Sequence, residues 1–383
     1  MSYSFELSEQ QELIRQTARD FAESEIRPHV LEWDEAQHFP TDVFRKMGEL
    51  GFLGIMVPEE LEGAGLGPIE YALVVEEISR VDPAVGLGVA AHNGLCTNHI
   101  LLFGSDDIRS RYIPDLASGR TMGMWGLTEP GSGSDAGGMR TTAVRDGDSW
   151  VINGSKNFIT HASVGRTAVI MAVTEPGIGS KGISAFVMDR DTPGFSTGKK
   201  ENKLGMRCSD TASLILENVR VPADHLLGES TGLGFKQALQ ILDGGRISIA
   251  ANSLGCAQGA YETALAYAKE RKQFGQPLSE FQATQFKLAQ MAMGIETARL
   301  MTYKAAWMRA QGMDINIAAA EAKLYASEVA TRVTNEAVQI LGGYGFTKDY
   351  PAEKYYRDVK LLTIGEGTSE IQRLVISRRL LAD

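Results

Sequence analysis

The order of local patterns along the chain constrains its fold more than any other feature of the sequence. Apolar residues recur at helical spacing near the start, for example in 13–21 and 69–81, and again after Gly232. Between these parts lie strand-like apolar runs that are separated by Gly, Pro and Asp. An alternating α/β sheet would mix the two patterns, so this order predicts helical and β domains that are separate in sequence.

Residues 1–120 are predicted to form a helical domain. Leu7 to Gln11 has the pattern of a capping box at a helix start. Pro28 is expected to end or kink this first helix, because proline lacks a backbone N–H and clashes with the preceding turn. Asp106–Tyr112 is the last helical stretch, and Pro114 is expected to close it or to open a short final turn.

Residues 121–228 are predicted to form an all-β domain. Asn153 and Gly154 stand between two strand-like runs, and this dipeptide is the strongest short signal for a hairpin turn. We therefore expect a hairpin at this position. Further strand candidates are Ala168–Val173, Ile183–Met188 and Ala212–Val221.

Residues 229–383 return to helical patterns. A Met-rich apolar stripe between Leu288 and Met308 recurs at threes and fours along one long helix. Such stripes are usually core packing, and we interpret this one as core and not as a cofactor site. Gln339–Gly345 is expected to break the next helix because of its glycines.

Composition argues against several classes of protein. The net charge of −10 does not suggest a nucleic-acid-binding protein, so an anionic ligand would need local Arg, Lys or helix N-termini. No apolar run approaches the roughly 18 residues that span a bilayer. No signal peptide is recognised, so we expect an intracellular protein without membrane insertion, in the simplest case in bacterial cytoplasm. Cys96, Cys208 and Cys256 are isolated and no HExxH motif occurs, which indicates neither disulfides nor a metal site.

Two segments carry residues that suggest chemistry. In Ile364–Arg373, Glu366 stands between two glycines where an amphipathic helix is expected to open. Taken alone, such a carboxylate is usually a favourable charge at a helix N-terminus. In Gly126–Asp135, glycines and hydroxyls suit a phosphate or a ring carbonyl, but the segment matches neither the GxGxxG fingerprint nor a P-loop.

Together these segments resemble the acyl-CoA dehydrogenase family, in particular its short- and branched-chain members. The resemblance covers nearly the whole chain, because four further strings match in the family's order: Lys156–Thr160, Asp243–Arg246, Arg271–Gly275 with Gln282, and Gln339–Gly343. It implies an α+β multidomain fold. The expected parts are an N-terminal α-helical domain (1–120), a middle β-barrel-like domain of two packed sheets (121–228) and a C-terminal four-helix bundle (229–383).

The resemblance implies FAD as cofactor and assigns contacts to several parts of the chain. Residues 125–134 would line FAD, and 158–160 would lie against the flavin ring with the Thr160 hydroxyl near N5. Arg271 and the loop at Gln339 would reach the FAD of a neighbouring subunit. Phe158 replaces the Trp of many members, which keeps stacking but loses a hydrogen-bond donor. The implied cofactor-binding residues are Trp125, Leu127, Thr128, Gly133, Ser134, Phe158, Ile159, Thr160, Arg271, Phe274, Gln282, Gln339, Gly342, Gly343, Thr368 and Glu370.

The implied reaction is the α,β-dehydrogenation of an acyl-CoA thioester to the trans-2-enoyl-CoA. Glu366 would be the base that removes the α proton, flavin N5 would accept the hydride, and electrons would pass to electron transfer flavoprotein. The backbone N–H of the base would help to polarise the thioester carbonyl. Asp243 and Arg246 are implied substrate contacts, although an i, i+3 ion pair without a ligand is an equal alternative. The implied substrate-binding residues are Ser134, Asp243, Arg246 and Gly367, and no metal is implied.

A few positions bear on the acyl group. Some relatives carry the base on the helix of Asp243–Arg246, but this chain has Gly244 and Gly245 there. Gly86 stands where relatives that process glutaryl-CoA carry Arg, which argues against a dicarboxylic acyl group. Gly365 replaces a Tyr that lines the pocket of many straight-chain members, so we expect a short or branched acyl chain.

Two other functions are kept as alternatives. An acyl-CoA oxidase would use oxygen as oxidant, but such oxidases are usually longer, with an extra C-terminal helical domain, and this chain stops at Asp383. A non-catalytic scaffold of the same fold would be expected to have lost the base or the flavin-binding string. The implied assembly is a homotetramer, built as a dimer of dimers around the C-terminal helices.

Overall fold

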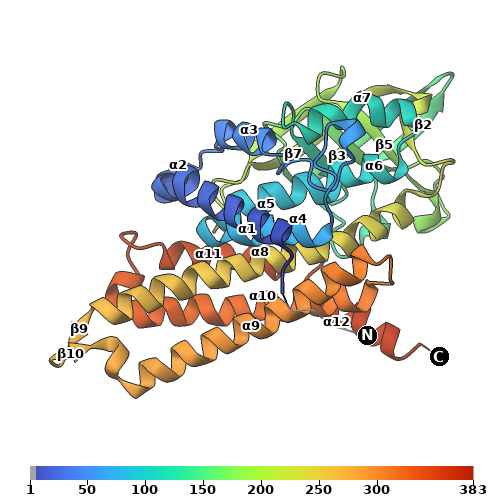
Figure 1. Ribbon diagram of the computed structural model, residues 1–383. Coiled ribbons are helices and arrows are strands. Elements are labelled where there is room, and N and C mark those ends of the chain that lie inside the picture. The colour runs from blue at the N-terminus through green and yellow to red at the C-terminus, as the bar shows by residue number, and fades with distance from the viewer. Residues whose placement is uncertain (1–5, 383) are drawn as a thin grey trace.

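The computed structural model describes residues 6–382 of the chain. N-terminal helices lie between a β domain and a bundle of long C-terminal helices (Figure 1). Along the chain, the elements follow the predicted order of helices, strands and helices. Within residues 6–382, no helix is both long and apolar enough to cross a membrane.

The N-terminal region is helical, as predicted. The Ser8 side chain accepts a hydrogen bond from the Gln11 amide and the Gln11 side chain accepts one from the Ser8 amide, which confirms the capping box. After Phe21 the chain passes through a π-turn and a 3-10 turn with Pro28, so the helix bends there as expected. The helical segments are α1 (Glu9–Phe21), η1 (Ala22–Ile26), η2 (Arg27–His29), α2 (Val30–Ala36), α3 (Thr41–Glu49), η3 (Glu59–Leu61), α4 (Pro68–Val81), α5 (Pro83–Ala91), η4 (His92–Thr97), α6 (Asn98–Phe103) and α7 (Asp106–Ala117).

The helix at Pro114 differs from the prediction. α7 does not end near Tyr112 but continues through Pro114 to Ala117. A proline inside a helix costs about 3 kcal/mol. Leu116 and Ala117, which follow the proline, are buried in a core shared with the β domain, and this packing keeps the last turn helical.

The β domain is one hydrogen-bonded sheet that folds into two packed layers, in agreement with the expected architecture. One layer has the strand order β6-β7-β3-β2 and the other contains β1, β4, β5 and β8, and the single pair Thr142–Val173 joins β2 to β4. Apolar side chains fill the space between the layers, where the Trp150 and Phe186 ring centroids are 5.3 Å apart. The strands are β1 (Gly123–Gly126), β2 (Thr142–Asp146), β3 (Ser149–Thr160), β4 (Thr167–Val173), β5 (Ile183–Asp189), β6 (Phe195–Lys200), β7 (Thr211–Pro222) and β8 (Leu226–Leu227).

The predicted hairpin at Asn153 and Gly154 is wrong. β3 runs straight through both residues, and its pairing with β7 shifts register there, which makes the dipeptide a bulge. Gly154 has a φ of 150°, and a Cβ on it would lie 2.4 Å from Thr141 Oγ1, so close approach of β2 requires the glycine. The tight turn between β2 and β3 instead uses Gly147.

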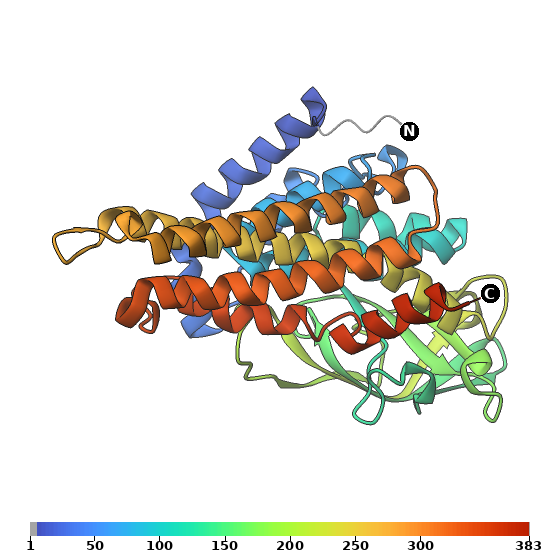
Figure 2. The same ribbon diagram turned by 90° about the horizontal axis from the view of Figure 1, so that it is seen from below.

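The C-terminal region is a bundle of α8 to α11, and α12 runs alongside α10 (Figure 2). The Met-rich stripe of α9 is core as predicted, because Leu288, Met291 and Ile295 are buried in it. α10 breaks at Gly342, again as predicted. The segments are α8 (Gly234–Glu270), β9 (Lys272–Gln273), β10 (Gln276–Pro277), η8 (Leu278–Glu280), α9 (Gln282–Ala310), α10 (Asn316–Leu341), η9 (Gly342–Gly345), α11 (Ala352–Leu362) and α12 (Ser369–Leu380).

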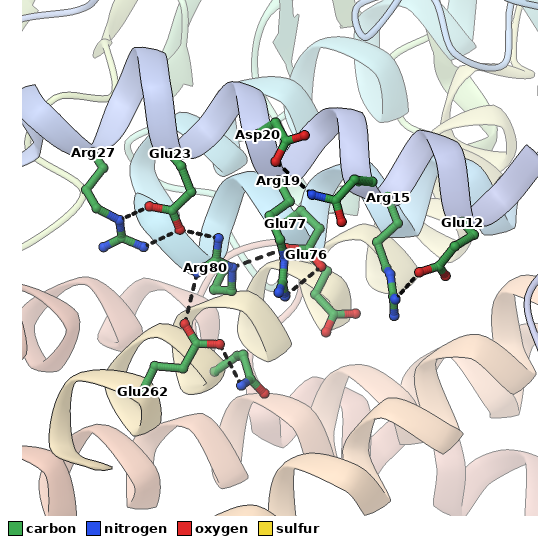
Figure 3. A network of polar contacts seen from close by, with 12 residues as sticks. Glu12, Arg15, Arg19, Asp20, Glu23, Arg27, Glu76, Glu77, Arg80 and Glu262 are labelled. Atoms are coloured by element: carbon green, nitrogen blue, oxygen red, sulfur yellow. Dashed lines mark hydrogen bonds and ion pairs between the residues drawn. The ribbon is translucent and has the colours of Figure 1, made fainter. Parts of the chain in front are cut away.

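A network of ion pairs ties the first helix to α4 and to the bundle (Figure 3). Arg80 on α4 is buried, and its guanidinium contacts the carboxylates of Glu23, Glu77 and Glu262. Arg19 on α1 pairs with Glu77 at 3.0 Å. Since a buried charge is costly without partners, these contacts hold α1, α4 and α8 in one arrangement.

A second buried cluster joins all three regions of the chain. Lys354 Nζ on α11 lies 2.9 Å from Asp82 Oδ1, between α4 and α5, and 2.6 Å from Asp358 Oδ2. The Met206 amide, from the loop before β7, donates to Asp358 Oδ1. Burial opposes the ammonium, but Asp358 and Asp82 outweigh it and raise the pKa of Lys354 well above its usual value.

Candidate active site

Glu366 lies in the connection between α11 and α12 and does not open the helix as predicted. The cap of α12 is Thr368, whose hydroxyl accepts from the Ile371 amide at 3.3 Å. Glu366 has a φ of 52° and Gly367 a φ of 93°, so two consecutive residues are left-handed. This conformation is uncommon outside glycine. It turns the Glu366 side chain away from α12 and toward α8.

The Glu366 carboxylate fits against α8 because position 245 has no side chain. A Cβ on Gly245 would lie 1.9 Å from Glu366 Oε2. Oε2 is shut off from solvent and has no hydrogen-bond partner within residues 6–382. Burial raises the pKa of Glu366 to about 7, and the cations Lys323 and Arg246 oppose this shift. The site therefore holds a carboxyl group that gains and loses a proton near neutrality.

Lys323, on α10, belongs to this site although it is absent from the predicted residues. Its side chain is fully buried, and Nζ donates to the Gly367 carbonyl at 2.7 Å. Burial lowers the pKa of Lys323 to about 8, and the Glu366 carboxylate opposes that change. The sequence signal was a lone lysine in the run Ala318–Ala326, where the buried positions otherwise carry alanine.

Asp243 and Arg246 form the i, i+3 ion pair of the alternative prediction. Arg246 Nη1 lies 2.5 Å from Asp243 Oδ1, and Asn316 also donates to this carboxylate at 3.2 Å. Arg246 is buried, and its Nε has no partner within residues 6–382. The pair occupies the same turns of α8 as Gly245, so it lies beside Glu366.

The loop after β1 is held by a buried ion pair outside the predicted site residues. Glu129 Oε1 accepts from Lys156 Nζ at 2.7 Å and from the Thr141 amide at 2.9 Å, and Oε2 accepts from the Arg140 amide at 2.6 Å. Burial lowers the pKa of Lys156 to about 8, against the pull of Glu129. The sequence signal for this pair was Glu129 itself, one of the two acidic residues in the matching string Gly126–Asp135.

The predicted cofactor residues of this loop differ in exposure. Leu127 is buried in the core, whereas Gly133 and Ser134 are exposed. Trp125 is half-buried and donates from Nε1 to His99 Nδ1 at 3.0 Å. The Thr128 carbonyl accepts from the Asn157 amide at 2.8 Å, which ties this loop to β3.

Phe158 stands out from the sheet at a bulge of β3. The β3–β7 register shifts between Lys156 and Ile159, and Phe158 has a φ of 58° with its ring 65% exposed. An exposed aromatic ring at a bulge offers a flat apolar surface to a ligand. Ile159 points the other way, into the core between the layers, and Thr160 is half-buried.

The other predicted cofactor residues gather at the far end of the bundle. The β9–β10 hairpin projects beyond that end, away from the β domain (Figures 1 and 2). There Arg271 Cζ lies 5.6 Å from the centroid of the Tyr344 ring, and Phe274 is 95% exposed. The structure thus separates these residues from those of the β domain in a single chain. The exposed members of the group are Arg271, Phe274, Gln282, Gln339, Gly342 and Gly343.

The exposed groups fit FAD. Phe158 presents a ring for stacking, and no heavy atom lies within 4 Å of the Cβ positions of Gly131 and Gly133, so the backbone between them is accessible to a ligand. Glycines 342 and 343 are equally open. Arg271 is an exposed cation suited to a pyrophosphate. Thr368 caps α12 and Glu370 is exposed in its first turn.

Models of the acyl-CoA dehydrogenase domains match the chain in the same order as its three regions. The N-terminal domain matches residues 8–120, the middle domain 124–219 and the C-terminal domain 232–381. The probable acyl-CoA dehydrogenase YngJ of Bacillus subtilis (strain 168) is 52% identical over 379 residues, which cover 99% of this chain and 100% of the relative. The short-chain specific acyl-CoA dehydrogenase, mitochondrial, of Bos taurus is 49% identical, covering 99% of this chain and 92% of the relative.

Solved structures agree with these relatives. Butyryl-CoA dehydrogenase from Megasphaera elsdenii has a TM-score of 0.97 and 41% identity, covering 99% of this chain and 100% of that chain. A chain solved in work on the electron transferring flavoprotein of Acidaminococcus fermentans has a TM-score of 0.98 and 47% identity, covering 100% of both chains. The matches confirm the expected fold, an oxidoreductase acting on acyl-CoA, and FAD as cofactor. The chain belongs to the acyl-CoA dehydrogenase family.

Proposed function

We propose that this acyl-CoA dehydrogenase acts on a short or branched acyl-CoA, with Glu366 as the base that removes the α proton. The observation that carries the proposal is the Glu366 carboxylate, whose Oε2 is shut off from solvent against Gly245 and whose pKa is raised by burial to about 7. A base with this pKa is ionised in part at neutral pH and still binds a proton firmly. Anaerobic addition of butyryl-CoA to the purified protein should bleach the flavin colour, and no bleaching with any acyl-CoA would contradict the proposal.

The backbone of the same turn supports this role. The Glu366 amide donates no hydrogen bond to another residue within 6–382, so it is free for a ligand. An amide donor beside the base suits a thioester carbonyl, because negative charge develops on that oxygen as the α proton leaves. One short turn therefore offers both a proton acceptor and an oxygen-binding donor.

Gly245→Ala tests whether the carboxylate needs the space on α8. The added methyl group would lie 1.9 Å from Glu366 Oε2, which must then rotate away. Displacing a reacting group by about 1 Å can cost roughly 100-fold in rate. Stability should stay the same or rise, because alanine favours a helix interior by about 0.5–1 kcal/mol over glycine. We expect flavin reduction to slow by roughly 100-fold with an unchanged or higher thermal midpoint.

Gly294→Ala in α9 is the matched control for this substitution. Its methyl group would meet Val329 and not Glu366. Flavin reduction should therefore stay within about twofold of wild type. A Gly245→Ala protein that reduces flavin as fast as Gly294→Ala would contradict the proposed position of the base.

We further propose that FAD lies against Phe158 and the loop at 126–134. Bound there, the flavin supplies the acceptor for the hydride from the β carbon. The ring of Phe158 stacks on it, and the backbone of Gly131–Gly133 and the Ser134 hydroxyl offer donors. The ion pair between Glu129 and Lys156 ties this loop to β3.

The remote group at the β9–β10 hairpin is proposed to complete the FAD site of a second subunit. Within one chain the hairpin projects away from the β domain (Figure 1), so Arg271 and Phe274 reach a flavin only in another copy. Phe286, Met293 and Leu300, spaced by seven on α9, are also exposed and suit a helix interface. We propose a homotetramer, a dimer of dimers. Analytical ultracentrifugation that finds a monomer with tightly bound FAD would contradict it.

Electron transfer flavoprotein is the proposed electron acceptor, in a bacterial cytoplasm. Support comes from family membership and from the similar chain solved in work on electron transferring flavoprotein. The alternative, an oxidase, predicts that the bleached flavin regains its colour in air at the rate of turnover. Slow reoxidation in air, with fast turnover when electron transfer flavoprotein is added, is the expected result.

Gly365→Tyr tests the proposed room for a branched acyl group. A Cβ on Gly365 meets only Leu361, at 3.5 Å or more, so the backbone accepts a side chain there. An added ring beside the reacting carbons should hurt 2-methylbutyryl-CoA and isobutyryl-CoA far more than butyryl-CoA, by at least about 10-fold in kcat/KM. Palmitoyl-CoA should be a poor substrate of the wild type. Equal losses on branched and straight substrates would count against the open pocket.

A further inference from the structure

We propose that Lys323 is a positioning residue for the base: its ammonium holds the Glu366–Gly367 turn through the Gly367 carbonyl and places a positive charge near the Glu366 carboxylate. This inference rests on the proposed role of Glu366. Lys323 acts through its neighbours, because its Nζ donates to the Gly367 carbonyl in the turn that carries Glu366.

Two buried donors converge on the turn that carries the base. Lys323 Nζ donates to the Gly367 carbonyl at 2.7 Å from α10, and Gln372 Nε2 donates to the same oxygen at 2.8 Å from α12. Gln372 Nε2 also lies 3.3 Å from the Glu366 carbonyl. Both donor side chains are fully buried. With these carbonyls held on the protein side, the left-handed turn is fixed and the Glu366 amide is left without a protein acceptor.

A charged donor is more than the geometry requires. Gln372 shows that a neutral amide reaches the same carbonyl. A buried ammonium is disfavoured unless an anion is near, and burial accordingly lowers the pKa of Lys323 to about 8. Lys323 forms no ion pair within 4 Å of a carboxylate among residues 6–382. The Lys323 ammonium therefore interacts with the Glu366 carboxylate through space and is not neutralised by a direct ion pair among residues 6–382.

Among the other charged groups around Glu366, Arg246 of α8 also acts as a cation that opposes the rise in the pKa of Glu366. Arg246 also pairs with Asp243 at 2.5 Å, and its effect on the Glu366 carboxylate is smaller than that of Lys323. Two further titratable groups near the turn carry no positive charge. The Tyr71 hydroxyl of α4 donates to the Ala90 carbonyl, and Glu370 of α12 is exposed. The remaining cation, Arg309 of α9, lies against Gly244, on the neighbouring position of α8.

Lys323→Met should shift the pH dependence of flavin reduction. Methionine matches the length of the side chain but has no charge, so the Glu366 carboxyl should hold its proton to higher pH. We expect the acid limb of the single-turnover reduction rate with butyryl-CoA to move up by about one pH unit or more, which is a tenfold loss on that limb. Lys323→Arg keeps a cation, and its acid limb should stay near that of wild type.

The comparison separates this role from a structural one. Lys304→Met, on the exposed face of α9, is the control and should leave the limb unmoved. A rate that falls equally at all pH values, with no shift of the acid limb, would show that Lys323 only supports the turn and would overturn the proposed role of its charge. If Lys323→Met does not retain FAD, Lys323→Gln takes its place, because glutamine keeps a hydrogen-bond donor without the charge. The acid limb of the Lys323→Gln reduction rate must then move to higher pH as well. If Glu366→Gln is inactive while neither neutral variant moves the limb, only the role of Lys323 fails; an active Glu366→Gln refutes the base itself.

Discussion

Glu366→Gln should abolish dehydrogenation while the protein keeps its fold and its FAD. The amide nearly conserves the shape of the carboxyl group, so it fits against Gly245, but it cannot take up the α proton. Loss of a general base costs up to about 10,000-fold in rate. No other carboxylate lies in the matching position, since Gly244 and Gly245 stand on the α8 turn that faces the site. We therefore expect a loss of roughly 1,000-fold or more in flavin reduction.

The measurement is stopped-flow bleaching of the flavin by butyryl-CoA without oxygen. Glu60→Gln, the same chemical change on an exposed carboxylate of η3, is the matched control and should react at nearly the wild-type rate. Bleaching of Glu366→Gln at a rate near that of wild type would show that the base is elsewhere.

The pH dependence of the wild type follows from the same carboxyl group. Burial raises the pKa of Glu366 to about 7, so the reduction rate should rise as pH increases through 7. The same pKa shift changes the free energy of unfolding with pH in the opposite direction. A carboxyl whose pKa is raised in the folded state binds its proton more tightly there than when unfolded, so its contribution to stability falls as pH rises from 4.5 to about 7. Glu366→Gln should therefore be at least as stable as wild type at pH 8.

Lys354→Met should cause the largest loss of stability among the substitutions considered. It leaves Asp82 and Asp358 buried without their shared cation. Removing one partner of a buried ion pair costs about 3–5 kcal/mol. The loss should be greater at pH 8 than at pH 5, because Asp358, once protonated, no longer repels Asp82 or resists burial. Burial already raises the pKa of Asp358 in the wild type, which favours this recovery in acid.

Thermal unfolding of the FAD-bound protein at both pH values is the measurement. Lys348→Met is the control, since Lys348 and Glu35 form an ion pair with both side chains 65% exposed. Such surface pairs contribute less than about 1 kcal/mol. If Lys354→Met unfolds at the same temperature as Lys348→Met, the buried cluster does not hold the three regions together.

Local patterns in the sequence were sufficient for the type and order of the elements. Helical spacing in 69–81, the capping box at Ser8 and the glycines after Leu341 act over one or two turns, and each gave the expected element. The same holds for the Met-rich stripe of α9, because burial of one helix face repeats with the helical period. The matching strings then assigned the family, since they fix residue types at many separated positions.

Tertiary packing decided the features that local patterns misrepresented. Asn153-Gly154 became a bulge because β7 and Thr141 approach the strand there, and α7 kept its last turn beyond Pro114 because Leu116 is buried. The Ile159 side chain points into the core between the layers, because side chains of a strand alternate between its faces, and its contact with the flavin stays a prediction. These outcomes depend on neighbours that are distant in sequence.

The environment of the proposed base, Glu366, likewise depends on the tertiary structure. The sequence determined that Glu366 stands between two glycines, but its burial, its fit against Gly245 and the ammonium of Lys323 come from three separate helical elements. A pKa depends on the charges and the solvent within a few ångströms, whatever their position in the chain. The sequence by itself therefore determined which carboxylate to consider, and the tertiary structure decided that it titrates near neutral pH.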